Sequence, residues 1–300
     1  LLYFGEKEAV IEGIIKKKQT THEVKIQIIS GHKRVWVDGK LLSLSSEFLQ
    51  NFFSLLFAPD QLTAYKENPQ EKRSFFDRAL CLLDLNYVEN LKNFNKARKQ
   101  KNILLKQGRD QEITVWNQLI SKSAPKLIAQ RRLLIDEINQ SIGDVFSNLT
   151  HRTDKLEIHY RSDLEEKTNL SPEQIFEFYQ NRLSQEKELG FSLPGPQKDS
   201  FWMTLNQKKD KMTFSQGEQR VAFLSLQFVL RKVLKRKLNF TPILLLDDVF
   251  SELDPEVRKH SLEEIFSKNS QVFLTAASCD ADWFKSNQAI KVEQGNIVEI

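Results

Sequence analysis

The stretch from Ile243 to Asp254 constrains the fold of this chain more than any other. It begins with four aliphatic residues and continues into two adjacent carboxylates, Asp247 and Asp248, in the sequence I-L-L-L-D-D. A short aliphatic run of this kind is typical of a strand buried on both faces of a parallel sheet. Because ligands of open α/β sheets bind at the carboxyl edge of the strands, the sequence predicts a parallel sheet with an acidic site at that edge.

A second segment, Ser215 to Arg220, reads S-Q-G-E-Q-R and precedes a helix predicted over 221–238. Ser215 has a simple structural reading, an N-cap with Glu218 as its capping-box partner. The same helix start can instead bind an anion, because free N–H groups and the helix dipole attract negative charge and Gly217 leaves the approach open. In their order along the chain, this segment and the stretch from Ile243 resemble the signature motif and Walker B strand of the ATP-binding-cassette superfamily.

The rest of the chain alternates between strand and helix patterns. Alternating apolar residues over 10–42 predict an antiparallel meander with turns at Ser30-Gly31 and Asp38-Gly39. Two long helices are predicted over 86–109 and 112–149, with a kink at Pro125, forming a helical hairpin or short coiled-coil arm. A helix opened by Ser171-Pro172 is predicted to run to about Leu189. Further strands are predicted at 201–205, 271–275, 290–292 and 296–300, the last two closing the sheet.

The first helix of this hairpin has the strongest charge asymmetry in the chain. Between Asn90 and Arg109 there is no acidic residue, and the basic residues are Lys92, Lys96, Arg98, Lys99, Lys101, Lys106 and Arg109. Such a face can neutralise DNA phosphates, which makes binding salt-dependent. The alternative interpretation is a solvated helix whose charges have no partner, and the sequence leaves both open.

Composition excludes several classes of protein. The net charge of +4 is too small to establish a nucleic-acid partner by itself. The two cysteines, Cys81 and Cys279, exclude a disulfide scaffold or a cysteine zinc site, and the five histidines show no metal spacing. No apolar run is long enough to span a bilayer, and charged residues Glu6, Lys7 and Glu8 stand where a secretory segment would be apolar. We therefore expect a cytoplasmic protein with no membrane partner.

Together, these motifs resemble the RecF family, recombination mediators related to the SMC-type ATPases. The further segments that resemble the family are F-A-P-D at 57–60, the run at 68–77, Trp116 and G-P-Q-K-D at 195–199. The family's turn usually reads G-P-H-[RK]-D, so Gln197 stands where a histidine is expected. The resemblance implies an α/β fold, an ABC/SMC-type ATPase head with a mixed β-sheet flanked by helices, an antiparallel meander near the N-terminus and an inserted helical arm. It divides the chain into a first head lobe (1–85), the arm and second-lobe insertion (86–190) and the C-terminal part of the head (191–300).

The resemblance also implies roles for single residues. Asp247 would hold Mg²⁺ through water, and Asp248 would orient or deprotonate the water that attacks ATP. Ser251 and Asp254 would form the D-loop at the dimer seam, and Thr275 stands at the switch position, where the transporter branch has a histidine. The signature residues that would engage the γ-phosphate held by the other subunit are Ser215, Gly217 and Gln219.

The implied partners follow from this shared site. ATP would drive formation of a homodimer, and hydrolysis would release it. The arm would help to clamp single-stranded DNA or single-strand/duplex junctions, together with RecO and RecR. The family is a weak DNA-stimulated ATPase that serves DNA replication, gap repair and SOS induction.

One motif of the family is missing. None of the ten glycines belongs to a G-x-x-x-x-G-K-[ST] phosphate loop, and the sequence starts at Leu1. If the chain is a RecF ATPase, this loop is expected upstream, and these 300 residues alone should hydrolyse ATP negligibly. The alternative is a non-catalytic DNA-binding or dimer-partner protein that has lost the loop. The intact Asp247, Asp248 and Ser215 favour the ATPase.

Overall fold

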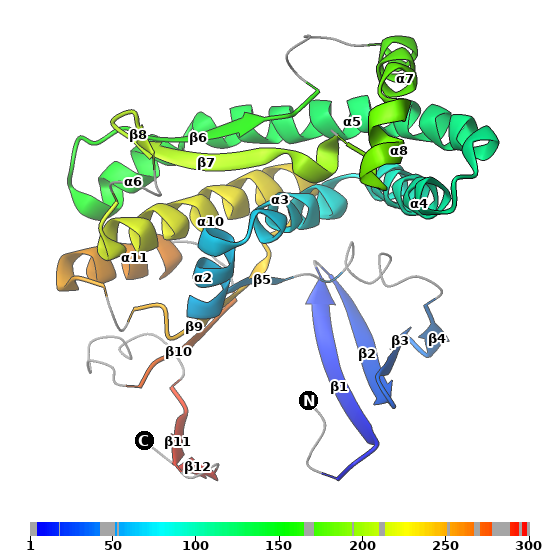
Figure 1. Ribbon diagram of the computed structural model, residues 1–300. Helices are drawn as coiled ribbons and strands as arrows, with labels where there is room; N and C mark the ends of the chain where they lie inside the picture. The colour runs from blue at the N-terminus through cyan, green and yellow to red at the C-terminus, as the bar shows by residue number, and fades with distance from the viewer. Residues whose placement is uncertain are drawn as a thin grey trace.

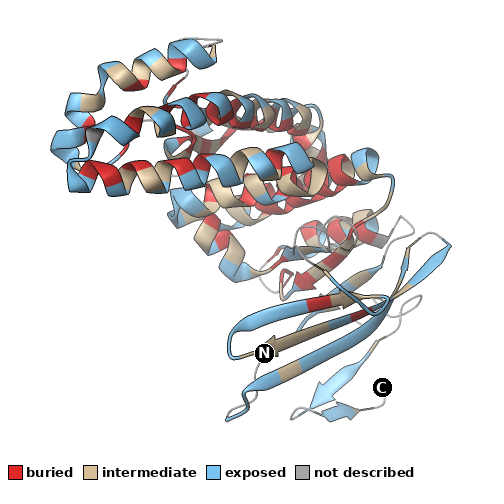
Figure 2. Cartoon of the chain, turned by 90° about the vertical axis from the view of Figure 1, so that its right-hand side faces the viewer, coloured by how far each residue is buried: buried red, intermediate tan, exposed pale blue. Residues whose placement is uncertain are grey.

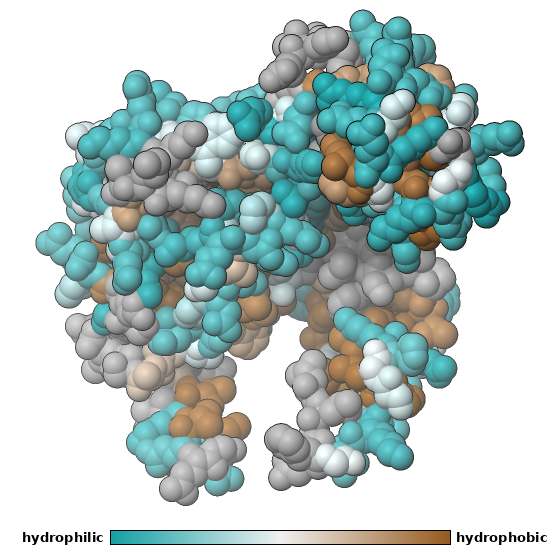
Figure 3. All heavy atoms as spheres, in the orientation of Figure 1, coloured by the Kyte–Doolittle hydropathy of each residue, from teal (hydrophilic) through white to brown (hydrophobic). Residues whose placement is uncertain are grey.

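The computed structural model describes residues 5–17, 19–42, 52, 54–164, 171–193, 195–209, 214–250, 253–266, 271–277, 289–293 and 296–298. Most helices lie together in one layer, and the N-terminal meander and the C-terminal strands extend from the same side of it (Figure 1). The surface is hollowed between these two extensions (Figure 3). The α/β class predicted from the sequence is confirmed.

The N-terminal meander has the predicted topology. Its antiparallel strands, paired in sequence order, are β1 (Glu8–Lys17), β2 (Thr20–Ile29), β3 (His32–Val37) and β4 (Lys40–Leu41). Both predicted turns are two-residue hairpins with left-handed backbone: φ is 48° at Ser30 and 50° at Asp38, each followed by a glycine of positive φ. Most of the described sheet is exposed (Figure 2), and its buried residues are Val24 and Val35.

The strand predicted from I-L-L-L-D is the centre of a parallel sheet. β9 (Ile243–Asp247) pairs with β5 (Ser54–Phe57) on one side and β10 (Val272–Thr275) on the other. One face buries Leu244, Leu246 and Phe57 against α10 (Gln216–Leu238), where the rings of Phe57 and Phe223 lie 5.4 Å apart. On the other face, Leu56 is 43% and Phe273 is 55% exposed. The prediction of burial on both faces is therefore right for one face of the described sheet only.

The helices between these strands build most of the core. They are α2 (Pro59–Glu67), α3 (Pro69–Leu83), α4 (Leu85–Gln107), α5 (Ile113–Asn139) and α6 (Ile142–Thr150). The single helix predicted over 112–149 is wrong, because α5 ends at Asn139. The Asn139 side chain there exchanges hydrogen bonds of 2.7 and 2.9 Å with the carbonyl and N–H of Ile158. Pro125 lies inside α5 and does not end it.

The predicted hairpin is part of a packed helical lobe rather than a free coiled coil. α7 (Pro172–Asn181) packs on α5, and α8 (Leu183–Leu189) packs on α4. Ser171 caps α7 as predicted, but the helix predicted to reach Leu189 is interrupted at Arg182. Near the hairpin tip, Leu104, Leu105 and Ile113 form a small cluster with Leu183. Each hairpin helix thus has a further helix packed against it.

A second antiparallel sheet lies beside α5 and α3. Its middle strand β7 (Ser200–Leu205) pairs with β6 (Leu156–Arg161) and β8 (Lys208–Lys209). Phe201, Met203 and Leu205 are buried, as their alternation predicts. The rings of Phe201 and Phe76 stack with centroids 4.4 Å apart, which fixes α3 against this sheet.

The C-terminal strands do not close the parallel sheet among the described residues. β11 (Lys291–Glu293) and β12 (Asn296–Val298) pair only with each other, after α11 (Pro255–Phe266) and β10. Their prediction as strands is confirmed, but their predicted partner is wrong. In the part of the chain that is described, no helix has the length and apolar character needed to cross a membrane.

Candidate nucleotide site and basic helix

Asp247 and Thr275 meet at the carboxyl edge of the parallel sheet. They are aligned neighbours at the ends of β9 and β10, and the Thr275 hydroxyl donates a hydrogen bond of 2.6 Å to the Asp247 carboxylate. Both residues are exposed. The structure thus joins the residue predicted to hold Mg²⁺ to the residue at the switch position.

Asp248 stands where the chain turns sharply out of β9. Its φ of 47° is left-handed, a conformation that aspartate tolerates better than most residues. Its N–H lies 3.2 Å from both the carbonyl oxygen and the hydroxyl of Thr275. Because of this turn, Asp248 lines a pocket of about 220 Å³ together with Lys66, Gln216 and Arg220. The second carboxylate is thereby placed beside the start of α10.

The start of α10 confirms the predicted capping box. The Ser215 hydroxyl accepts from the Glu218 N–H at 3.2 Å, and the Ser215 N–H donates to the Glu218 carboxylate at 2.8 Å. This backbone hydrogen bond, followed by the ion pair with Arg152 at 2.9 Å, lowers the pKa of Glu218. The helix start is therefore held in shape by Glu218 and Arg152.

The three signature residues differ in their surroundings. Ser215 and Gly217 are exposed, and a Cβ added at Gly217 would meet no atom within 4 Å. Gln219 is half-buried, and its amide donates to the Phe214 carbonyl at 2.9 Å. Ser215 and Gly217 are therefore open to solvent, whereas the Gln219 side chain is bound to the backbone of its own chain.

The D-loop residues are only partly placed. Ser251 lies outside the described residues. Asp254 is exposed immediately before α11, and its carbonyl accepts the Arg258 N–H at 2.9 Å. This is the first backbone hydrogen bond expected of an N-cap residue, so the predicted capping position of Asp254 agrees with the backbone.

The sheet edge offers oxygen ligands of the kind that Mg²⁺ prefers, the carboxylate of Asp247 and the hydroxyl of Thr275. Nowhere in the described ranges do three or more His, Cys, Asp or Glu side chains gather as a metal cluster. An ion with so few protein ligands keeps most of its waters, which is the usual behaviour of Mg²⁺. The residues present therefore fit the ion that the sequence implies.

The basic residues of α4 separate into two groups. Lys92, Lys96, Lys99 and Lys106 are exposed, and none of them pairs with a carboxylate of the described chain. Their spacing of four, three and seven residues places them on one stripe of the helix. We call these four residues the lysine stripe.

The other three basic residues have different environments. Lys101 is fully buried, pairs with Glu186 at 2.6 Å and lies over the ring of Tyr179. The prediction that Lys101 contacts DNA is therefore wrong. Arg98 is half-buried and lines a cavity, and Arg109 is paired with Glu112. Of the seven basic residues, four are therefore exposed without a carboxylate partner among the described residues, one is buried against α8, one lines the cavity and one is paired with Glu112.

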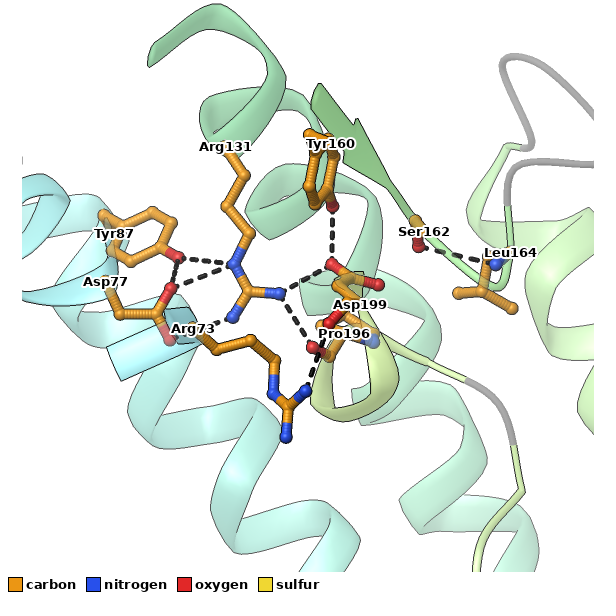
Figure 4. Close-up of polar contacts among 9 residues, drawn as sticks. All are labelled: Arg73, Asp77, Tyr87, Arg131, Tyr160, Ser162, Leu164, Pro196 and Asp199. Atoms are coloured by element: carbon orange, nitrogen blue, oxygen red, sulfur yellow. Dashed lines mark hydrogen bonds and ion pairs between the residues drawn. The ribbon is translucent and has the colours of Figure 1, made fainter. Parts of the chain in front are cut away.

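Sequence reasoning missed a buried polar network centred on Arg131 (Figure 4). This guanidinium pairs with Asp77 at 2.9 Å and Asp199 at 2.6 Å and donates to the Pro196 carbonyl at 2.7 Å. Tyr160 donates to Asp199 at 2.5 Å. Burial raises the pKa of Asp199 to about 6, although Arg131 acts against this. The available signal was the position of Arg131, four residues after Leu127 and three before Leu134 on the apolar stripe of α5.

This network ties the turn at 195–199 to α3, α4, α5 and β6. Gly195 is required there, since its φ is 155° and an added Cβ would lie 2.8 Å from the Tyr179 hydroxyl and 2.7 Å from the Gln197 side chain. Gln197, found where a histidine was expected, donates to the Leu193 carbonyl at 2.7 Å. The segment G-P-Q-K-D therefore has a structural role in joining the head to the helical lobe.

Comparison with known proteins places this geometry in a family. No family model matches the chain. A curated relative from Exiguobacterium sp., "DNA replication and repair protein RecF", is 30% identical over 301 residues, covering 96% of this chain and 81% of the relative. A solved structure described as the recombination mediator protein RecF with ATP superposes with a TM-score of 0.86 at 23% identity, covering 100% of this chain and 82% of that one.

An SMC head has the same fold at greater distance. Its solved structure, bound to the C-winged helix domain of ScpA, superposes with a TM-score of 0.51 at 15% identity, over 98% of this chain and 74% of that one. This likeness confirms the predicted ABC/SMC-type head. The RecF match extends over nearly the whole chain and includes the strand, the signature helix and the helical lobe, so the chain belongs to the RecF family of DNA replication and repair proteins.

Proposed function

We propose that this protein acts as an ATP-dependent dimeric clamp on DNA. The observation that carries the proposal is the shared pocket of Asp248 and the start of α10. It brings a carboxylate at the end of a parallel strand next to a helix start whose Ser215 and Gly217 face outward. A solved relative is described as RecF with ATP, which supports a nucleotide at the corresponding place here.

The residue roles follow from this arrangement. Asp247, beside the Thr275 hydroxyl, would hold Mg²⁺ through its waters, and Mg²⁺-ATP supplies the phosphoryl group that is transferred to water. Asp248 would orient the attacking water and accept its proton.

The signature residues would act on the ATP of a second copy. The N–H groups at the start of α10 and the helix dipole attract phosphate, and the Ser215 hydroxyl adds a further donor. Among the described residues, no atom lies within 4 Å of the position that a Cβ at Gly217 would take. We infer that the space above this residue is needed for a ligand or surface outside the chain, with Gln219, Ser251 and Asp254 near the seam of the homodimer.

The DNA-binding surface would be the lysine stripe. Lys92 and Lys106 are fourteen residues apart, so the stripe is roughly 21 Å long at 1.5 Å per residue. That length is comparable with about six phosphate steps along one strand of B-DNA. Four cations without a carboxylate partner in the described part of the chain favour DNA contact over the alternative of a solvated helix. We infer binding to single-stranded DNA or single-strand/duplex junctions in the cytoplasm, with RecO and RecR, in gap repair and SOS induction.

The lysine stripe can be tested against a matched pair on the neighbouring helix. Lys92→Gln/Lys96→Gln removes two stripe charges, whereas Lys122→Gln/Lys126→Gln removes two exposed charges at the same spacing on α5. In fluorescence anisotropy titrations with single-stranded DNA at several salt concentrations, the first variant should lose about 1.4 units of the slope of log K against log salt.

The α5 variant should retain the slope of the unsubstituted chain. If the stripe variant and the unsubstituted chain have equal slopes, the lysine stripe does not contact DNA and is a solvated surface. Equal losses in both variants would contradict the assignment of DNA binding to α4.

A second candidate function rests on the absence of G-x-x-x-x-G-K-[ST] from the 300 residues. A chain that never has this loop would bind DNA or a dimer partner without hydrolysing ATP. The coding DNA read in frame upstream of Leu1 separates the two candidates. Finding the loop there supports the ATPase, and an in-frame stop without it supports the non-catalytic protein.

A further inference from the structure

A large cavity lies between α3, α4, β5, α10 and the turn at 195–199. Its volume is about 960 Å³, at the upper end of the range for small-molecule sites. Asp248 and the signature helix start line a different pocket. The cavity is therefore separate from the nucleotide site described above.

Its polar wall has an excess of positive charge. Arg73, Arg78, Arg98 and Arg131 line the cavity, against one lining carboxylate, Asp77. Arg131 is neutralised, because it pairs with both Asp77 and Asp199 (Figure 4). Arg78 pairs with Glu71 at 3.9 Å, so the positive excess comes from Arg73 and Arg98.

Arg98 and Arg73 have no carboxylate of their own among the described residues. The Arg98 side chain is half-buried, and its Nε is buried without a hydrogen-bond acceptor in this part of the chain. Arg73 donates one hydrogen bond, at 3.1 Å, to the backbone carbonyl of Asp199. Burial, followed by the neighbouring charge of Arg131, lowers the pKa of Arg73. An anion between Arg73 and Arg98 would relieve both effects.

Other residues of the lining are apolar. They include Leu55 from β5, Leu230 from α10, and Val88, Leu91 and Phe94 from α4. Apolar walls with a few convergent polar groups are typical of sites for organic ligands rather than for simple ions. The ligand should therefore combine a charged group with an apolar body.

We propose that this cavity binds a small phosphate monoester with an apolar body, whose phosphate lies between Arg73 and Arg98. A phosphate monoester has close to two negative charges at neutral pH, which matches the two guanidinium groups without a carboxylate. The wall of Leu91 and Phe94 holds the organic part. This site does not depend on the proposed clamp function.

The proposal can be tested with phenyl phosphate as the probe and isothermal titration calorimetry on the 300-residue chain. Arg98→Gln should weaken binding by about tenfold or more, since a charge-assisted hydrogen bond is lost. Lys122→Gln, at an exposed position of α5 that does not line the cavity, should leave the affinity within about twofold. Inorganic phosphate should bind more weakly than phenyl phosphate, because it lacks the apolar body.

A second variant, Leu91→Trp, fills the apolar side of the cavity and should also abolish binding, with circular dichroism confirming that each variant is folded. The proposal is overturned if the unsubstituted chain does not bind phenyl phosphate at millimolar concentration. Equal affinities of Arg98→Gln and Lys122→Gln would also overturn it, as would binding of inorganic phosphate as tight as that of phenyl phosphate. DNA binding by the Arg98→Gln variant, measured in parallel, reports separately on the lysine stripe.

Discussion

Arg131 shows how much of this molecule depends on single buried charges. It joins α3 through Asp77 and the turn at 195–199 through Asp199, and it is only 2% exposed. Burial acts against its charge, but Tyr87, Asp77 and Asp199 together raise the pKa of Arg131 well above the ordinary value. Buried ion pairs of this kind are costly to break, since removing one partner leaves the other charge without compensation.

Asp199 should make stability depend on pH in an unusual direction. Its pKa is raised from 3.8 to about 6, so the folded chain keeps this proton over a range in which the unfolded chain has released it. Stability from this group is therefore present at low pH and is lost as pH rises toward 6. Relative to Asp199→Asn, the unfolding free energy of the unsubstituted chain should fall by up to about 3 kcal/mol between about pH 4 and pH 7.

Urea denaturation of both chains across this pH range measures the difference. Asp136→Asn, at an exposed position of α5, serves as the control and should run parallel to the unsubstituted chain. If the curve of Asp199→Asn also runs parallel, Asp199 does not titrate as described.

Lys101 and Glu186 provide a second residue-scale prediction. Both side chains are fully buried and 2.6 Å apart. Lys101→Met should destabilise the chain by about 3–5 kcal/mol, because it leaves the Glu186 carboxylate buried and unpaired. The double variant with Glu186→Gln should recover much of this loss, since Gln is neutral and keeps an acceptor for the Leu193 N–H.

A double-mutant cycle in urea gives the coupling energy. Lys99→Met, exposed on the same helix, should change stability by less than about 0.5 kcal/mol. Additive costs of the two buried substitutions would contradict a direct ion pair.

At the scale of elements, the start of α10 has two roles that substitutions can separate. Asp and Ser are about equally good N-caps, whereas Ala costs about 1 kcal/mol. Ser215→Asp should therefore keep the thermal stability of the chain, and Ser215→Ala should lower it. Only Ser215→Asp places a carboxylate where the proposed γ-phosphate approaches, so it should abolish ATP-dependent dimerisation. If the Ser215→Asp variant dimerises as well as the unsubstituted protein does, Ser215 serves only as a helix cap.

Local signals in the sequence predicted many of the elements correctly. The meander follows from alternation and two glycine turns, β9 from an aliphatic run, and α7 and α10 from their capping residues. Predictions failed where contacts between segments far apart in the sequence set the end of a helix or the burial of a side chain. α5 ends where Asn139 bonds to β6, and Lys101 is buried because α8 covers α4. Neither partner is close in sequence, so residue patterns on one helix could not reveal them.

At the scale of the whole molecule, the exposure of the candidate site agrees with the proposed homodimer. Asp247, Thr275, Ser215 and Gly217 are all exposed, although they are the residues expected to surround ATP. One face of the parallel sheet is also partly open among the described residues, with Phe273 and Leu56 exposed. The proposed homodimer, in which a second copy covers the exposed residues of the site, predicts the first of these observations.

The central claim is that ATP drives a dimer and that hydrolysis releases it. The most direct test is the mass of the native, full-length protein in solution. Mass photometry should show that Mg²⁺-ATP and DNA convert monomers to dimers. In Asp248→Asn these dimers should persist about ten times longer or more, because release requires hydrolysis. Asp136→Asn should behave as the unsubstituted protein does. A mass that stays monomeric with ATP and DNA, or an unchanged dimer lifetime in Asp248→Asn, would contradict the account.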